Sequence, residues 1–139
     1  MRASVRPRST ESKFRLLYLG NDLELISALK NALGKALGKG THVLVSCSDR
    51  ESAIMFLKSD IPYQLLLIDF EWREREGLKL ASLARLLKHR KRMPTVLVTR
   101  TEPSRGLRVL ARSAGVNECV SKTPDLGAVI ETIRRLSEL

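Results

Sequence analysis

Three polar residues that could act together on a phosphoryl group each lie at the end of a short aliphatic run. Asp69 follows Leu65-Leu66-Leu67-Ile68, Thr99 follows Val96-Leu97-Val98, and Lys122 ends the last such run. A carboxylate can attack a phosphoryl group as a nucleophile, while a hydroxyl and an ammonium can hold the phosphoryl oxygens. This chemistry needs the three side chains in one place and normally a divalent cation held by further carboxylates.

The elements that must position these residues follow a pattern that recurs five times from Phe14 onward. Each repeat has a short aliphatic run, a polar turn and an amphipathic helical segment. Continuous apolar runs are typical of parallel strands that are covered on both faces. The runs predict strands at Phe14–Leu19, His42–Cys47, Tyr63–Ile68, Thr95–Val98 and Asn117–Val120.

A helix is expected after each strand, because apolar residues recur there at helical spacing. For the first of these helices, either Asn21 or Asp22 could cap the amino end. Strands that alternate with helices predict right-handed crossovers and a parallel sheet. The carboxyl ends of parallel strands meet at one edge of the sheet, so we expect Asp69, Thr99 and Lys122 to lie close together.

In these residues and their order, the chain resembles the receiver domain of response regulators, the CheY-like family. The resemblance covers residues 14 to about 138. Asp69 matches the family's phosphoacceptor, Thr99 its hydroxyl residue and Lys122 its lysine, and Gly77 matches a glycine that often opens the third helix. The resemblance implies an α/β three-layer sandwich over residues 14–139, flavodoxin-like and of (βα)5 type, with a parallel sheet in strand order 2-1-3-4-5.

The sequence departs from the family's pattern at the metal site. The family holds Mg²⁺ with two acidic residues after the first strand, and Gly20 and Asn21 stand at those positions. The remaining candidate ligands are Asp69, Asp22 and Glu71, and a site without the acidic pair should bind Mg²⁺ much more weakly. The family's aromatic switch residue on the fifth strand is also absent, since Cys119 occupies its position.

Two functions therefore remain open at this stage. The chain could be a two-component signalling receiver in which a histidine kinase or a phosphotransfer protein phosphorylates Asp69. It could instead be a phosphorylation-independent pseudo-receiver that binds an acidic protein or an anionic ligand. We do not expect an enzyme, because a hydrolase of the haloacid-dehalogenase type has a second Asp two residues after the first, where this chain has Glu71.

Basic residues gather on two predicted helical segments, and the chain carries a formal net charge of +10. Arg105, Arg108 and Arg112 recur at spacings of three and four, so they share one helix face. They could form a solvated face or a surface for an acidic partner protein. The same two readings hold for a basic run formed by Arg85, Lys88, His89, Arg90, Lys91 and Arg92.

Composition and length limit the remaining possibilities. The 139 residues suit one domain, preceded by a flexible basic tail at residues 1–13. No apolar run approaches the roughly 18 residues of a membrane span. We expect a cytoplasmic protein that is a monomer or a weak homodimer and has no membrane partner. A nucleic-acid partner is not expected, because no helix-turn-helix, RNP or zinc motif is present.

Overall fold

Five parallel strands alternate with helices in the computed structural model, which describes residues 13–38, 40–73, 75–123 and 125–137. The sheet has the order β2-β1-β3-β4-β5, which confirms the predicted fold class and strand order. The elements are β1 (Phe14–Leu19), α2 (Leu23–Leu37), β2 (His42–Cys47), α3 (Arg50–Lys58), β3 (Leu65–Asp69), α4 (Arg75–Leu86), the 3₁₀ helix η1 (Lys88–Arg90), β4 (Thr95–Thr99), α5 (Arg105–Ser113), β5 (Glu118–Ser121) and α6 (Gly127–Ser137).

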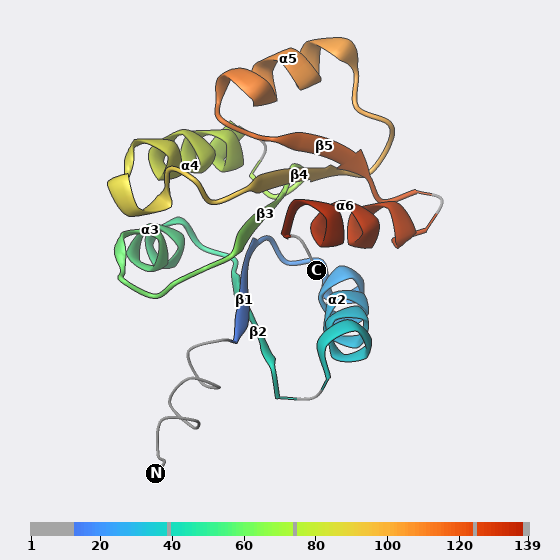
Figure 1. The fold of residues 1–139 in the computed structure, drawn as a ribbon. Helices are drawn as coiled ribbons and strands as arrows, with labels where there is room; N and C mark the ends of the chain where they lie inside the picture. The colour runs from blue at the N-terminus through green and yellow to red at the C-terminus, as the bar shows by residue number, and fades with distance from the viewer. Residues whose placement is uncertain (1–12, 39, 74, 124, 138–139) are drawn as a thin grey trace.

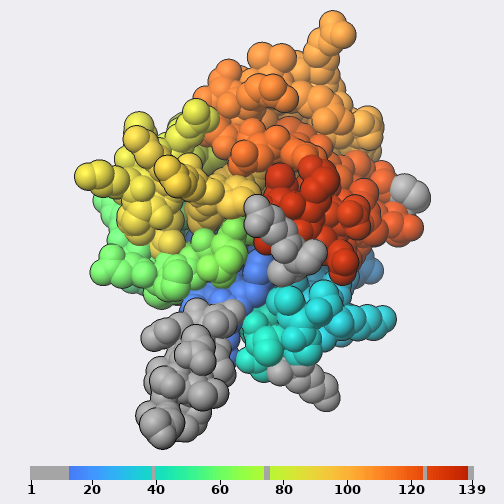
Figure 2. All heavy atoms as spheres, in the orientation of Figure 1, coloured from blue at the N-terminus to red at the C-terminus, as the bar shows by residue number. Residues whose placement is uncertain are grey.

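Helices cover both faces of the sheet and make a three-layer sandwich (Figure 1). On one face, α2 and α6 pack against side chains that include Leu16 and Leu65. On the other face, α3, α4 and α5 pack against side chains that include Leu17 and Leu66. Neighbouring residues of β1 and β3 thus serve opposite faces, which explains why these strands are continuously apolar. In the space-filling view, part of β1 (blue) is visible near the centre of the molecule (Figure 2).

Three of the five strands have boundaries that differ from the prediction. The third strand begins at Leu65 and ends at Asp69, so Tyr63 precedes it and Asp69 belongs to it. Tyr63 is nevertheless buried, because its ring packs beneath the guanidinium of Arg90, 5.0 Å away. The fourth strand extends to Thr99. The fifth lies one residue later than predicted, at Glu118–Ser121.

The basic run after α4 is not a uniformly solvated face, and Arg90 is the exception. Its side chain is buried, and its guanidinium donates to the carbonyl oxygens of Phe56, Leu57 and Ser59 at 2.9–3.1 Å. These carbonyls belong to the carboxyl end of α3, where helical partners are lacking. Arg90 therefore caps α3 and fixes η1 against it, a role that the charge pattern could not reveal.

Two sequence predictions lie outside the described residues. The predicted tail at residues 1–13 falls there except for Lys13, and Pro124, at the predicted start of the last helix, does so too. None of the helices in the described ranges has the length and apolar character that crossing a membrane requires.

Candidate functional site

The predicted site residues Asp69, Thr99 and Lys122 lie at the same edge of the sheet. Asp69 ends β3 and pairs with Val98, Thr99 ends β4 and pairs with Ser121, and Lys122 follows β5 directly. The backbone amide of Lys122 donates to the carbonyl oxygen of Thr99 at 2.8 Å, which continues the sheet pairing by one residue. The parallel register thus brings all three residues together.

The Asp69 carboxylate is buried and bonded to donors from three directions. Its residue is 3% exposed. One oxygen, Oδ2, accepts from the Tyr18 hydroxyl at 2.9 Å and from the Lys122 ammonium at 2.9 Å. The other oxygen, Oδ1, accepts from the Glu71 backbone amide at 3.2 Å. Both oxygens therefore have protein partners, as a buried carboxylate requires.

Lys122 joins two carboxylates through one ammonium group. Its Nζ lies 2.6 Å from Oδ2 of Asp22 and 2.9 Å from Oδ2 of Asp69. Burial would lower the pKa of Lys122, but the hydrogen bonds to Asp22 and Asp69 raise it above its ordinary value. A positive charge that belongs to the chain therefore lies between the two carboxylates.

Asp22 confirms the capping prediction and also has a second role. Its side chain accepts from the Leu25 amide at 3.1 Å and so caps the amino end of α2. Burial alone would raise the pKa of Asp22, but the hydrogen bonds from Lys122 and the Leu25 amide bring it below its usual value. Asp22 thus connects the start of α2 to the β5 end of the site.

Tyr18 is the site residue that sequence reasoning missed. Its side chain is fully buried in β1. Its hydroxyl donates to Asp69 and accepts from the Asp22 backbone amide at 3.2 Å. Burial and the nearby charge of Asp69 raise the pKa of Tyr18 far above its ordinary value, so the phenol stays protonated and donates.

Gly20 is required because the Tyr18 phenol fills the space beside it. A Cβ at Gly20 would lie 2.5 Å from the Tyr18 hydroxyl oxygen and 2.8 Å from the Asp69 Cβ. Position 20 is one of those at which the resemblance expects an acidic residue. A strand tyrosine two residues before a glycine was the available signal for this arrangement.

Thr99 and Glu71 make local contacts instead of turning toward Asp69. The buried Thr99 hydroxyl donates to the Thr101 carbonyl oxygen at 2.6 Å. The Glu71 carboxylate accepts from the Arg100 backbone amide at 3.3 Å, which links the loops after β3 and β4. Glu71 approaches Asp69 through its backbone amide alone among the contacts of the described residues.

The carboxylates at this edge of the sheet do not form a Mg²⁺ site. Of the candidate ligands, Asp22 and Asp69 are bridged by the Lys122 ammonium, and the Glu71 carboxylate is bonded to Arg100. Within the described part of the chain, no three His, Cys, Asp or Glu side chains are grouped closely enough to hold a metal ion. Mg²⁺ prefers several oxygen ligands in octahedral geometry, and a bound ammonium repels it.

The predicted partner residues Arg105, Arg108 and Arg112 are exposed on α5. Arg108 forms an ion pair with Glu102 at 2.7 Å and donates to the Cys119 carbonyl oxygen at 3.4 Å. No ion pair joins the other two arginines to a carboxylate of the described residues.

The close contact of Gly20 with Tyr18 predicts that any side chain at position 20 destabilises the fold. Gly20→Ala should lower the free energy of unfolding by about 2 kcal/mol, because the new methyl group collides with a phenol that cannot move without breaking its hydrogen bond to Asp69. Urea unfolding monitored by circular dichroism would measure the change.

The matched control is Gly106→Ala on α5. A Cβ there meets only the Ser104 hydroxyl oxygen, at 4.0 Å. This variant should leave stability unchanged or raise it by up to about 1 kcal/mol, as alanine does in helices. Equal effects of the two substitutions would contradict the role assigned to Tyr18.

The bridging ammonium predicts a stability difference that depends on pH. Lys122→Met should destabilise the fold by about 3 kcal/mol at neutral pH, because Asp22 and Asp69 lose their shared cation. The depressed pKa of Asp22 means that this contribution is present above about pH 4 and is lost as pH falls further. The raised pKa of Lys122 means that it is present up to about pH 10 and is lost at higher pH.

Urea unfolding of both proteins between pH 3 and pH 11 would test this prediction. Lys30→Met, at an exposed position on α2, is the control and should match the wild type throughout. A difference between wild type and Lys122→Met that stays constant down to the most acidic pH would contradict the account.

Comparisons with known proteins place this fold among receiver domains. No family model and no curated protein matches the sequence. Similar solved structures include a signal receiver domain of two-component signal transduction from Clostridium thermocellum, which has 16% identity and a TM-score of 0.75, covering 91% of this chain and 98% of that one.

Two further structures show the same likeness at 16% identity, and each covers 91% of this chain. One is the receiver domain of a sensor histidine kinase from Pseudomonas aeruginosa PAO1, with a magnesium ion coordinated in its active-site cleft, at a TM-score of 0.71 over 99% of that chain. The other is the phosphorylated cyanobacterial phytochrome response regulator RcpA, at a TM-score of 0.73 over 92% of that chain. The chain therefore has the fold of response-regulator receiver domains, while its site lacks a set of metal ligands among the described residues.

Proposed function

We propose that this chain is a receiver-fold signalling module that binds an acidic partner protein without phosphorylation of Asp69. The observation that carries this proposal is the internal bonding of the Asp69 carboxylate by Tyr18, Lys122 and the Glu71 amide. A phosphoryl donor would have to reach a residue that is 3% exposed. It would also have to react at a site where Gly20 and Asn21 replace the family's acidic pair and where Asp22 and Asp69 are already joined by the Lys122 ammonium.

Without phosphorylation of Asp69, the function of the chain must come from a surface that binds a partner protein. The fold similarity to signalling receivers supports a role in partner binding, and fold similarity alone does not identify the partner. The partner must instead be inferred from the chemistry of the surface. The most distinctive feature of that surface is the set of arginines on α5.

The α5 face combines cations with exposed apolar area. Arg105, Arg108 and Arg112 share one side of the helix, and Val109 is exposed beside them, with 62% of its surface accessible. Arginines around an exposed apolar side chain are typical of protein interfaces, where arginine is enriched. Their charge favours a partner that carries carboxylates, since arginine can bind a carboxylate through two parallel hydrogen bonds.

Treatment with acetyl phosphate and Mg²⁺ gives a direct test of the Asp69 part of this proposal. We expect the intact mass of the wild type to remain unchanged, because Asp69 is 3% exposed and the described residues around it do not form a set of metal ligands. The variant Asp69→Ala serves as the negative control. The receiver domain of a phosphorylatable response regulator, treated in parallel, shows that the reagent is active.

A phosphoryl adduct on the wild type that Asp69→Ala abolishes would overturn this part of the proposal. It would favour the alternative in which a histidine kinase or a phosphotransfer protein acts on Asp69. The observation that favours this alternative is the contact of Lys122 with Asp69, because an ammonium there can hold phosphoryl oxygens.

The α5 surface predicts a second outcome, for which poly-L-glutamate is the probe. The triple variant Arg105→Glu/Arg108→Glu/Arg112→Glu should lose at least about tenfold in affinity, because attraction becomes repulsion at three positions. Asp69→Ala should bind as the wild type does, since Asp69 is buried at the end of β3 and is not part of the exposed α5 face. Fluorescence anisotropy at fixed ionic strength would measure both.

Two results would contradict the α5 assignment. One is a triple variant that binds poly-L-glutamate as well as the wild type does. The other is tighter binding of the wild type to duplex DNA than to poly-L-glutamate at equal charge, which would point to a nucleic-acid partner.

A further inference from the structure

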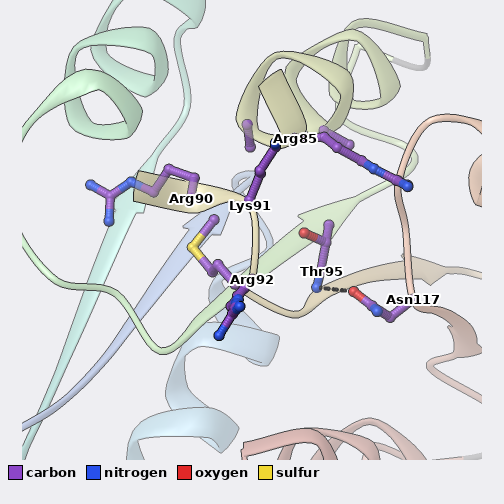
Figure 3. Close-up of a pocket in the computed structure, with 10 residues that line it drawn as sticks. Arg85, Arg90, Lys91, Arg92, Thr95 and Asn117 are labelled. Carbon is purple, nitrogen blue, oxygen red and sulfur yellow. Dashed lines mark hydrogen bonds between the residues drawn. The ribbon is translucent and has the colours of Figure 1, made fainter. Parts of the chain in front are cut away.

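A second group of cations lines a cavity of about 380 Å³ at the opposite end of the sheet from Asp69. The cavity lies beside Thr95, which begins β4, and Asn117, which precedes β5. Four basic residues line it: Arg85 from the end of α4, Arg90 from η1, and Lys91 and Arg92 from the segment between η1 and β4 (Figure 3). The Arg90 guanidinium is bonded to carbonyl oxygens at the end of α3, which leaves three basic side chains for the cavity. The α5 face and the Asp69 site do not explain this group.

The charges of the cavity are of one sign. No Asp or Glu lines it. Arg85, Lys91 and Arg92 take part in no ion pair with a carboxylate of the described ranges. Three cations around one concave surface repel each other, and an anion bound between them relieves this repulsion.

The cations are held by neighbouring structure. Arg90 points away from the cavity, and its three hydrogen bonds to carbonyls at the end of α3 fix the segment that continues into Lys91 and Arg92 (Figure 3). The stem of Arg85 lies against Gly115, where a Cβ would be 2.8 Å from the Arg85 Cδ. Gly115 also has a φ of +98°, a conformation that suits glycine. A side chain at position 115 would therefore displace Arg85.

Neutral donors complete the lining. Asn117 and Thr95 bond to each other twice: the Thr95 amide donates to the Asn117 Oδ1 at 2.7 Å, and the Asn117 amide donates to the Thr95 carbonyl at 2.8 Å (Figure 3). Because Oδ1 is an acceptor here, the amide nitrogen of the Asn117 side chain keeps its two hydrogens as donors. The Thr95 side chain lines the same cavity with a hydroxyl group.

From this arrangement we infer that the cavity is a binding site for a small molecule that carries a phosphate group. Guanidinium, ammonium and amide donors together match the oxygens of a phosphate. The volume of about 380 Å³ lies within the range of small-molecule sites and exceeds the needs of phosphate alone. Met93 and Ala84 supply apolar lining for the remainder of the ligand. This inference is independent of the proposed function, since it uses neither α5 nor Asp69.

Amide NMR with three probes at constant ionic strength would test the inference. Inorganic phosphate and AMP should produce saturable shifts at Thr95, Gly115 and Asn117, whereas adenosine, which lacks the phosphate, should not. Tighter binding of AMP than of inorganic phosphate would identify a phosphate ester as the preferred form. Equal binding would identify the phosphate group itself as the determinant.

Three double variants, one of them a control, separate the site from general charge effects. Arg85→Gln/Arg92→Gln should lower phosphate affinity at least about tenfold, because two charged donors are lost. Lys91→Gln/Arg92→Gln changes only exposed positions, should fold normally and should have the same effect. Lys30→Gln/Lys35→Gln on α2 removes equal charge elsewhere and should bind as the wild type does.

The inference would be overturned by phosphate shifts confined to α5, by adenosine alone shifting the same three amides, or by unchanged affinity in the folded Lys91→Gln/Arg92→Gln variant. The absence of any saturable shift at Thr95, Gly115 and Asn117 would overturn it as well.

Discussion

Burial of the Asp69 carboxylate is the constraint on which the rest of the site depends. A charged group that leaves water must find hydrogen bonds and a counter-charge, or the fold loses several kcal/mol. Here the Tyr18 hydroxyl, the Lys122 ammonium and the Glu71 amide supply them. The other features of the strand ends follow, because each of these donors must itself be held in place.

Two neighbouring residues, Gly20 and Asp22, hold these donors in place. The phenol of Tyr18 needs the space at Gly20, since any Cβ there would collide with it. The ammonium of Lys122 is shared with Asp22, whose carboxylate also caps α2. The ends of β1, β3 and β5 and the start of α2 are thus joined in one network. Such a network stabilises one arrangement of the sheet edge.

The Lys122 ammonium is one of several positive charges that the fold places in distinctive positions. Two other surfaces of the chain are distinctive, the α5 arginines and the cation-lined cavity beside Thr95. Both carry positive charge, in keeping with a net charge of +10.

Much of this architecture could be predicted from the sequence. The internal hydrogen bonds that occupy the Asp69 carboxylate could not. Alternating aliphatic runs and helical spacing predicted the βα repeats, and the resemblance supplied the strand order, which periodicity cannot provide. The convergence of Asp69, Thr99 and Lys122 followed from parallel strands. The roles of Tyr18 and Arg90 were missed, because Tyr18 bonds to a residue 51 positions away and Arg90 to carbonyls more than 30 positions away. The spacing of Tyr18 and Gly20 was a local signal for a phenol beside a glycine, but no local pattern identifies bonding partners so far away in the sequence. The direction of the Thr99 hydroxyl is equally a property of the folded loop.

The most direct test of this account is a Mg²⁺ titration of the wild type followed by amide NMR at Gly20, Asp69 and Lys122. The account predicts no saturable shift at these positions at millimolar Mg²⁺, because the Lys122 ammonium already lies between the Asp22 and Asp69 carboxylates. Saturable shifts at all three would contradict it, since they would mean that a metal ion displaces the ammonium and that the site retains the ability to bind Mg²⁺.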